Sequence, residues 1–457
     1  MEKFDVLVIG SGSGMIVASN AVASGMKTAV VESGPMGGTC MNRGCIPSKM
    51  LIYPADVVSI IREAEELGVK ATVNSIDFPK IMNRMHDYII EHSQQQAKAV
   101  EATRNLTWFR EAGGFISDYT MKVGKQVVRA DRIFIVSGAR PDIPPIREIE
   151  NVGYLTSDTV LKLETVPRSM IIVGGGYVAV EYGHFFSSIG TKVSIIQRNP
   201  RLLPEEEPEI SDLLKEEMGK RLQIFTNYEA LEAGEKNGIK IVTARNRVDG
   251  GFEDFSAEFL LIAAGRVPNS DLLKPEKTGV KLDEKGFVQV NEYLETGKNN
   301  IWALGDAIGK QMFKHVANLE AEIAWHNAVH EHKVEMDYSA APHAVFTHPQ
   351  IASVGLKESE AKQKGYKILV GKALYKDTAQ GAAMGEPQGF VKVIVEQGTG
   401  KILGGHIIGP FASTLIQEIT NAMAFGDKTF MPIIRGMHIH PAMSEVVQNA
   451  FGNLREA

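Results

Sequence analysis

The chain has 457 residues, of which 44% are hydrophobic and 23% charged, with a formal net charge of −6 at pH 7. A chain of this length is too long for a single hydrophobic core and indicates roughly two to four globular domains. Because the charge is negative and the basic residues are scattered, electrostatics give no case for nucleic acid or another polyanion as partner.

The N-terminus reaches a short apolar strand within a few residues, followed by Gly10. This stretch is too short for a signal peptide or a membrane span. We therefore expect a soluble, cytoplasmic protein with no membrane partner.

The first segment predicts a βαβ unit. Residues 4–9 form an apolar run typical of a buried strand, residues 16–24 suit a helix, and residues 28–32 suit a second strand. Between the first strand and the helix lies a glycine-rich loop. This order of elements is typical of a dinucleotide-binding domain, with a simple tight turn as the alternative.

Three glycines in this loop, Gly10, Gly12 and Gly14, would let the backbone approach a pyrophosphate at the helix N-terminus. Glu32 ends the second strand, where a ribose hydroxyl would lie. Met15 occupies the third glycine position of the fingerprint. We therefore expect Gly14 to supply the close approach of helix and strand.

The only two cysteines, Cys40 and Cys45, follow this unit, so any sulfur chemistry belongs to this pair. Residues five apart in a regular helix have Cα atoms roughly 8 to 9 Å apart, beyond the reach of about 7 Å that a disulfide allows. A bond between them requires distorted backbone, for which Gly44 offers freedom, and Pro47 suits the first turn of the helix that follows.

A cysteine pair at a helix start is typical of a reducible disulfide, because the helix dipole favours a thiolate there. In a reducing compartment such a pair is usually catalytic or redox-sensing. A structural staple is the alternative.

A second βαβ unit comprises a strand over 169–173, a helix through 181–188 and a strand over 192–197. Its loop contains Gly174 and Gly176. Two such units indicate two dinucleotides. Together with the dithiol beside the first unit, they indicate a flavin in one domain, a nicotinamide in the other, and electrons passing to sulfur.

Further motifs follow in order: Ser137-Gly138-Ala139-Arg140-Pro141, Ala264-Gly265-Arg266-Val267-Pro268-Asn269, Leu304-Gly305-Asp306-Ala307, Val345-Phe346-Thr347-His348-Pro349 and His440-Pro441-Ala442-Met443-Ser444-Glu445. With them the chain resembles, over essentially its whole length, the class I pyridine nucleotide-disulfide oxidoreductases, the family of lipoamide dehydrogenase, glutathione reductase, mycothione reductase and mercuric reductase. The resemblance implies an α/β fold with two Rossmann-like domains and a C-terminal α+β dimerisation domain. The implied boundaries are 1–145 and 268–335 for the FAD domain, 146–267 for the NAD(P) domain and 336–457 for the interface domain.

By this resemblance, Cys45 lies against the flavin and forms the charge-transfer complex, while Cys40 is the interchange thiol that attacks substrate. Lys49, one helical turn after Cys45, would reach flavin N5 and pair with Glu181. An ordinary surface lysine is the alternative for Lys49.

Tyr177 matches the aromatic residue that covers the flavin and swings aside for nicotinamide, with a plain apolar plug as the alternative. Asp306 matches the aspartate that binds the ribityl and phosphate region, and a helix N-cap is the alternative or an additional role. The remaining implied contacts are Gly38, Thr39 and Gly138 for FAD, and Ala179 and Gly265 for NAD(P).

His440 and Glu445 are the acid–base candidates, because imidazole suits proton transfer near neutral pH and a carboxylate fixes its tautomer. The resemblance implies that this dyad comes from the other subunit of a homodimer. His438 and His440 alternate as zinc ligands might, but the sequence contains no further ligand cluster, so we expect no metal site. Other histidines, including His184 and His348, are expected to be packed or hydrogen-bonded.

An acidic residue at the end of the second βαβ strand favours NAD, whereas arginine favours NADP. Arg198 stands there, so we expect NADPH, with NADH as the alternative. The acidic run over residues 205–207 is expected on a solvated turn.

The substrate is expected to be a small disulfide or dithiol of the lipoamide or mycothione type, possibly a lipoyl group on a carrier. Residues 45–49 resemble lipoamide dehydrogenase, and residues 314–318 and 440–450 resemble mycothione reductase. Asn20 stands where glutathione reductase typically has arginine. The alternatives are a flavin NAD(P)H oxidase or quinone or metal reductase, and a non-catalytic redox sensor.

Overall fold

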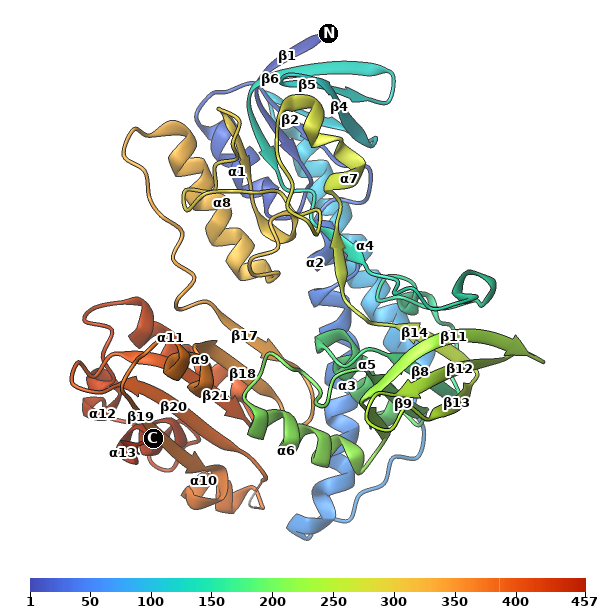
Figure 1. Cartoon of the computed structure of the whole chain (residues 1–457), viewed down its shortest axis with the longest axis vertical. Helices are drawn as coiled ribbons and strands as arrows, with labels where there is room; N and C mark the ends of the chain where they lie inside the picture. The colour runs from blue at the N-terminus through green and yellow to red at the C-terminus, as the bar shows by residue number, and fades with distance from the viewer. Residues whose placement is uncertain (386) are drawn as a thin grey trace. The chain divides into compact units, whose positions relative to one another are not determined.

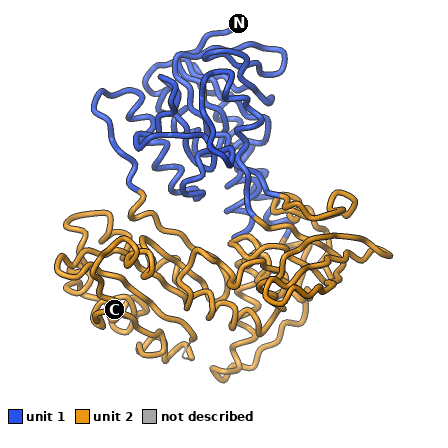
Figure 2. The backbone as a smooth tube through the Cα atoms, in the orientation of Figure 1, with its two compact units in different colours: residues 1–50, 82–142, 265–337 blue, residues 51–81, 143–264, 338–457 orange. Residues whose placement is uncertain are grey.

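The computed structural model describes residues 1–385 and 387–457. The chain forms two compact units, coloured separately in Figure 2. Unit 1 comprises Met1–Met50, Met82–Asp142 and Gly265–Asp337, and unit 2 comprises Leu51–Ile81, Ile143–Ala264 and Tyr338–Ala457. Helices α3 (Cys45–Glu63) and α4 (Phe78–Ala102) contribute residues to both units. The predicted domain boundaries stay predictions.

Unit 1 is built on a seven-stranded sheet in the order β3-β2-β1-β6-β5-β4, with β16 paired to β6 (Figure 1). Its strands are β1 (Glu2–Ile9), β2 (Thr28–Val31), β3 (Leu106–Phe109), β4 (Gly113–Ser117), β5 (Thr120–Val123), β6 (Gln126–Ile135) and β16 (Ile301–Ala303). Strands β3, β2, β1, β6 and β16 pair in parallel, and β5 and β4 extend the sheet antiparallel. Because both faces of β1 are covered, its residues from Val6 onward are fully apolar and buried.

Helix α1 (Gly14–Ala23) packs on β1 and on α8 (Lys314–Val329). The short strands β7 (Ala139–Pro141) and β15 (Arg266–Pro268) pair antiparallel, and α7 (Ser270–Leu273) follows β15. The predicted strands over 4–9 and 28–32 are confirmed, and the helix begins two residues earlier than expected.

Unit 2 contains a parallel sheet in the order β10-β9-β8-β14. Its strands are β8 (Ser169–Val173), β9 (Lys192–Gln197), β10 (Gln223–Thr226) and β14 (Phe259–Ile262), and its helices are α5 (Tyr177–Ser188) and α6 (Pro208–Gly219). The strands predicted over 169–173 and 192–197 have these same bounds. A three-stranded antiparallel sheet of β11 (Tyr228–Lys236), β12 (Ile239–Asn246) and β13 (Phe252–Ala257) shares an apolar core with them.

The C-terminal part of unit 2 is a six-stranded antiparallel sheet in the order β17-β18-β21-β20-β19-β22. Its strands are β17 (Pro342–Val345), β18 (Ile351–Gly355), β19 (Ile368–Leu374), β20 (Phe390–Glu396), β21 (Ile402–Ile408) and β22 (Arg455–Glu456). Its helices are α9 (Glu358–Gln363), α10 (Ala379–Ala383), α11 (Ala412–Ala424), α12 (Met431–Arg435) and α13 (Glu445–Gly452). Helices α11 and α13 pack on the sheet around a common core. The expected α/β architecture with a C-terminal α+β domain is confirmed.

The expectation for the acidic run over 205–207 is wrong, because Glu206 and Glu207 are both buried. Glu206 accepts hydrogen bonds from His343 and Ser353, each at 2.6 Å. Burial works against ionisation, but the bond to His343 holds the pKa of Glu206 below its usual value. Partners distant in sequence therefore make this burial possible.

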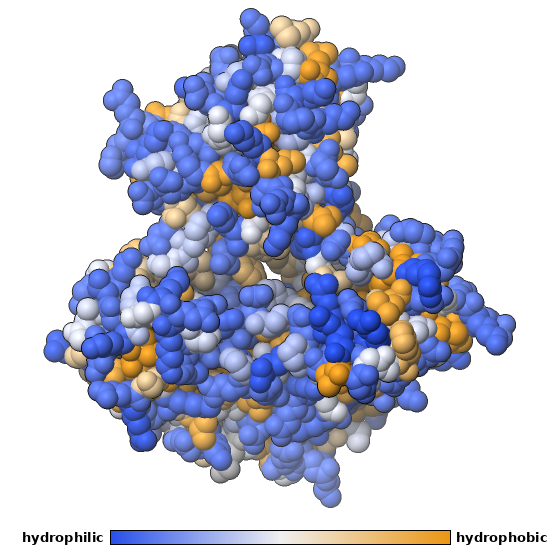
Figure 3. All heavy atoms as spheres, viewed as in Figure 1, coloured by the Kyte–Doolittle hydropathy of each residue, from blue (hydrophilic) through white to orange (hydrophobic). Residues whose placement is uncertain are grey.

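One helical stretch, Gly38–Leu67, is by length and composition apolar enough to cross a membrane, and 39% of its most apolar part is buried within the protein. The core helices of soluble proteins meet the same criterion. On the face seen in Figure 3, hydrophilic residues predominate over both units.

Candidate active site

The first glycine loop fits a dinucleotide closely. Gly10 has φ +110°, and a Cβ there would lie 2.2 Å from the carbonyl oxygen of Val136. A Cβ on Gly14 would lie 2.7 Å from Cγ1 of Val8, so Gly14 does supply the close approach of helix and strand. No atom lies within 4 Å of a Cβ built on Gly12, which leaves open space above the loop.

Glu32 follows β2 and lies directly beside this loop. Its Oε2 accepts hydrogen bonds from the backbone N–H and the hydroxyl of Ser11, at 3.0 and 2.9 Å. Its Oε1 accepts the N–H of Gly34 at 2.7 Å. The predicted ribose ligand is therefore held rigidly at the carboxyl edge of the sheet, as a dinucleotide site requires.

The cysteine segment consists of two helices with a break between them. Cys40 lies in α2 (Gly38–Asn42), and Cys45 is the first residue of α3. The break at residues 43–44 is the distorted backbone expected from the spacing. Gly38, at φ +61°, abuts Gly12, since a Cβ on Gly38 would lie 2.8 Å from the Gly12 Cα. The cysteine segment is thus seated on the nucleotide loop.

No disulfide joins the two cysteines in this structure, in which Cys40 is half-buried and Cys45 exposed. A hydrogen bond with Cys45, followed by burial, raises the pKa of Cys40, while the charges of Lys314 and Lys49 act in the opposite direction. The helix-start argument for a stabilised thiolate therefore does not apply to Cys40.

Lys49 lies one turn after Cys45 on α3, and its Nζ is 3.4 Å from the hydroxyl of Ser48. Glu181 is buried on α5, where its Oε1 accepts the N–H of Phe346 at 3.0 Å. Lys49 belongs to unit 1 and Glu181 to unit 2. Their pairing stays a prediction.

Sequence reasoning missed Lys314 as a site residue. It is the first residue of α8, and its Nζ donates to the hydroxyl of Ser13 at 3.0 Å. Burial lowers the pKa of Lys314, and the charges of Cys40 and Cys45 oppose that shift. Residues 314–318 stand out in the sequence by their resemblance to mycothione reductase, but only the tertiary fold brings α8 to the glycine loop, so the sequence did not predict this contact.

Asp306 lies in the short 3-10 turn Gly305–Ala307, 3.6 Å from Nε of Arg266. Burial raises the pKa of Asp306, and the charge of Arg266 offsets part of the rise. In the same unit the hydroxyl of Ser137 is buried without a hydrogen-bond partner among the described residues. No atom lies within 4 Å of a Cβ on Gly138. Open space and an unused donor both suit a bound FAD.

The second glycine loop, before α5, repeats the design of the first. A Cβ on Gly174 would lie 2.1 Å from the carbonyl oxygen of Ala263, whereas the space at Gly176 is open. Tyr177 begins α5, and its ring centroid is 5.7 Å from that of His343. Burial raises the pKa of Tyr177. Ala179, the third residue of α5, is fully buried, so the residues present fit a second dinucleotide.

Two arginines, Arg198 and Arg247, are in contact at the end of β9. Arg198 is exposed, and Nη1 of Arg247 donates to its backbone carbonyl at 3.0 Å. Arg201 instead pairs with Asp212 at 2.8 Å. Within residues 1–385 and 387–457, neither Arg198 nor Arg247 forms an ion pair. Arg247 comes from the turn after β12, and sequence reasoning missed it.

His440 and Glu445 form a dyad in unit 2, with Nδ1 of His440 2.8 Å from Oε1 of Glu445. The N–H of Ala442 donates to Oε2 at 3.1 Å, and both contacts lower the pKa of Glu445, the His440 bond most. The His440 side chain is 72% exposed, which leaves its second nitrogen accessible. The cysteines belong to unit 1, so the meeting of the dyad and the dithiol stays a prediction.

Three other histidines are paired with carboxylates. Nε2 of His438 is 2.9 Å from Glu418, and Nε2 of the fully buried His184 is 2.9 Å from Asp56. His348 lies 2.9 Å from Glu63. Across the described parts of the chain, no group of three or more His, Cys, Asp or Glu residues could hold a metal ion.

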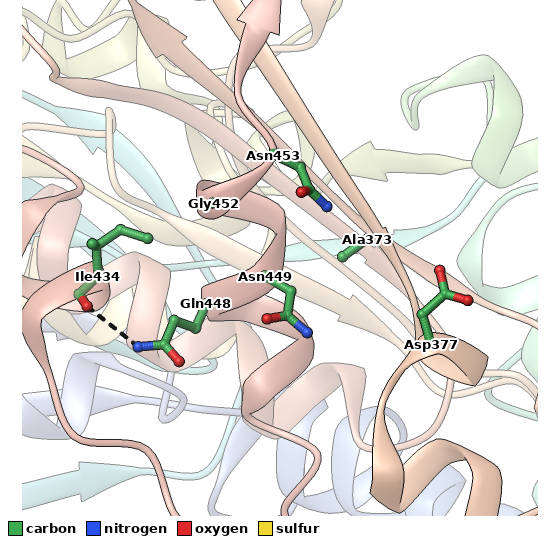
Figure 4. Close-up of a pocket in the computed structure, with 7 residues that line it drawn as sticks. All are labelled: Ala373, Asp377, Ile434, Gln448, Asn449, Gly452 and Asn453. Atoms are coloured by element: carbon green, nitrogen blue, oxygen red, sulfur yellow. Dashed lines mark hydrogen bonds between the residues drawn. The ribbon is translucent and has the colours of Figure 1, made fainter.

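A separate pocket of about 300 Å³ lies in the C-terminal domain, beside α13 (Figure 4). It is lined by Ala373, Asp377, Ile434, Gln448, Asn449, Gly452 and Asn453. Nε2 of Gln448 donates to the carbonyl of Ile434 at 3.3 Å across one side. None of the predicted site residues lines this pocket.

Two dinucleotide loops, with a dithiol seated on the first, define a flavin- and nicotinamide-dependent disulfide oxidoreductase. Comparison with known proteins agrees with this class. Residues 4–330 match the family described as pyridine nucleotide-disulphide oxidoreductase, and residues 341–451 match its dimerisation domain. The chain belongs to this family, and the second match implies a homodimer.

The chain is 37% identical to mycothione reductase of Mycobacterium tuberculosis, covering 100% of both chains. It is 34% identical to dihydrolipoyl dehydrogenase of Chlamydia muridarum, covering 97% of this chain and 95% of that one. A similar solved structure is the Cu(II) complex of the HOCl-induced flavoprotein disulfide reductase RclA from Escherichia coli, at 26% identity, TM-score 0.88 and 99% coverage of both chains. The chain is accordingly an FAD-dependent NAD(P)H disulfide oxidoreductase.

Proposed function

We propose that the protein is an NADPH-dependent reductase of a small disulfide of the mycothione type, acting in the cytoplasm. The observation that carries the reaction is the position of the dithiol, since Gly38 of the cysteine segment abuts Gly12 of the first dinucleotide loop. The substrate type is supported by the full-length similarity to mycothione reductase.

NADPH is supported by the exposed Arg198 at the end of β9 and by Arg247 beside it. Guanidinium groups bind phosphate in a planar, charge-assisted geometry, which suits the extra phosphate of NADPH. Arg201, which the sequence offered equally, is neutralised by Asp212.

In the proposed reaction the first loop, Glu32 and Asp306 hold FAD, and the second loop holds NADPH. FAD, when bound, supplies the chemistry that takes a hydride equivalent from nicotinamide and hands two electrons to sulfur. Tyr177 covers the nicotinamide site in the absence of coenzyme.

The thiols of this chain then do the substrate chemistry. The Cys40 thiolate attacks the substrate disulfide, so that a mixed disulfide forms and one substrate thiolate leaves. His440 of the partner subunit donates a proton to that leaving thiolate, and Glu445 keeps its imidazole oriented. Cys45 displaces the second thiol from Cys40, which restores the disulfide.

Dihydrolipoyl dehydrogenase activity is the second candidate, supported by the relatives of that name and by the Cys45-Ile46-Pro47-Ser48-Lys49 segment. In that case the electrons run from a lipoyl dithiol, free or on a carrier, to NAD.

The test is a matrix of NADPH and NADH, each with mycothione disulfide, lipoamide, glutathione disulfide and coenzyme A disulfide. We expect NADPH with mycothione disulfide to give the highest kcat/KM. Faster NADH-linked turnover of lipoamide favours the second candidate. The Cys40→Ser variant should lose disulfide reduction. If this variant instead oxidised NAD(P)H at the full wild-type rate, the protein would be an oxidase or a metal or quinone reductase.

A further inference from the structure

Lys314 has no role in the reaction proposed above. It lies at the start of α8, far in sequence from the cysteines, yet its side chain is directed to the first glycine loop. We propose that Lys314 is the cation that stabilises the thiolate of the reduced Cys40–Cys45 pair. This inference deepens the proposed function and rests on it for the cycle in which the pair is reduced.

The geometry connects Lys314 to the dithiol in two steps. Nζ of Lys314 donates to the hydroxyl of Ser13 at 3.0 Å. Ser13 follows Gly12, and Gly12 is the residue that Gly38 of the cysteine helix abuts. Neighbouring residues of one loop thus contact both the lysine and the cysteine segment.

The lysine is also fixed in place. The Ser13 hydroxyl that accepts from it donates in turn to Oδ1 of Asn318, one turn along the same helix, at 2.9 Å. A half-buried cation anchored in this way keeps its charge near the dithiol, unlike a mobile surface lysine.

Electrostatics support the assignment. The pKa of Cys40 is raised by its hydrogen bond with Cys45, by burial and by the charge of Cys45, and the two charges that oppose this rise are Lys314 from α8 and Lys49 from α3. In return, the charges of Cys40 and Cys45 raise the pKa of Lys314 and so oppose the lowering caused by burial. The pair therefore meets a second cation besides the lysine of its own helix.

Reduction of the pair creates the charge that Lys314 would offset. The disulfide takes up two electrons, supplied through the established activity, and one proton, and the S–S bond breaks to give one thiolate and one thiol. A nearby opposite charge favours the thiolate and so lowers the pKa of such a group.

The test measures thiolate formation directly, without turnover. The flavin-containing enzyme is reduced with dithiothreitol, freed of reductant under anaerobic conditions, and alkylated with iodoacetamide from pH 5 to 10. Mass spectrometry assigns the carbamidomethyl group to Cys40 or Cys45. We compare wild type with Lys314→Met, Lys314→Gln and Lys314→Arg. Lys310→Met serves as the matched control, because Lys310 is exposed and close in sequence.

We expect the pH midpoint of alkylation to rise by about 1 to 3 units in the Met and Gln variants. It should stay near wild type in the Arg and Lys310→Met variants. An unchanged midpoint in both uncharged variants, or an equal rise in Lys310→Met, overturns the assignment. Failure of the proposed function is separate, since it would appear as wild-type enzyme that turns over none of the disulfides.

Discussion

The coenzyme preference can be tested at the end of β9, where Arg198 and Arg247 lie together. If they bind the extra phosphate of NADPH, replacing Arg198 by Ala removes one charge-assisted hydrogen bond. Such a bond contributes about 1.5 to 3 kcal/mol. Since 1.36 kcal/mol corresponds to a tenfold change, kcat/KM for NADPH should fall roughly 13- to 160-fold.

The same substitution should leave NADH nearly unaffected, because NADH lacks that phosphate. Arg247→Ala should give a loss of the same kind. The double variant should lose less than the product of the two single losses, because Arg247 bonds to the carbonyl of Arg198 and the two sites are coupled.

The chain offers a matched control in Arg201, three residues beyond Arg198 and paired with Asp212. Arg201→Ala should change the NADPH to NADH ratio little. Steady-state kinetics of both coenzymes with one disulfide substrate give all values. An equal loss for NADH and NADPH in Arg198→Ala, or a loss as large in Arg201→Ala, would refute this reasoning.

Three further outcomes follow from the structure. Gly12→Ala should fold, because no protein atom lies near the added methyl, but should weaken FAD binding by about 1 to 3 kcal/mol, measured as flavin retained per chain. His440→Gln should slow disulfide reduction by about 10²- to 10⁴-fold, while stopped-flow reduction of bound flavin by NADPH stays unchanged. Burial lowers the pKa of His184, so its contribution to stability is complete above about pH 6.5 and declines as the pH falls below that value. Urea midpoints from pH 5 to 8 should therefore fall at the acid end in wild type and flatten in His184→Gln.

The sequence predicted what depends on local patterns. The strands around both glycine loops have the expected bounds within one to two residues, because buried parallel strands are continuous apolar runs. The close approach at Gly14 was also predictable, since a helix starting there needs a residue without a side chain. The C-terminal dimerisation domain followed only from family resemblance.

Contacts between distant segments could not be predicted. The sequence around Glu207 predicts a solvated acidic turn. In the structure Glu207 is buried, and its carboxylate lies 3.2 Å from Nζ of Lys392, which is also buried. Arg247 contacts Arg198 and Lys314 contacts Ser13, and the two come from a turn and a helix whose local sequence has no nucleotide signature. In each case the position of the side chain is set by how separate strands and helices pack.

The contacts around Ser11 join the segment that contains the chain's only cysteines to the first glycine loop. The Ser11 hydroxyl donates to Glu32 at 2.9 Å and accepts the N–H of Gly37 at 3.2 Å, so one residue ties the predicted ribose-binding residue Glu32 to the start of the cysteine helix. A side chain on residue 38 would clash with the glycine loop. The cysteine segment can therefore pack against this loop only because residue 38 is glycine. The pair is thereby fixed to the nucleotide site, and no other thiol exists in the 457 residues to carry electrons away. A substrate disulfide must therefore reach one of these two cysteines directly, which favours a small or extended molecule over a folded protein surface.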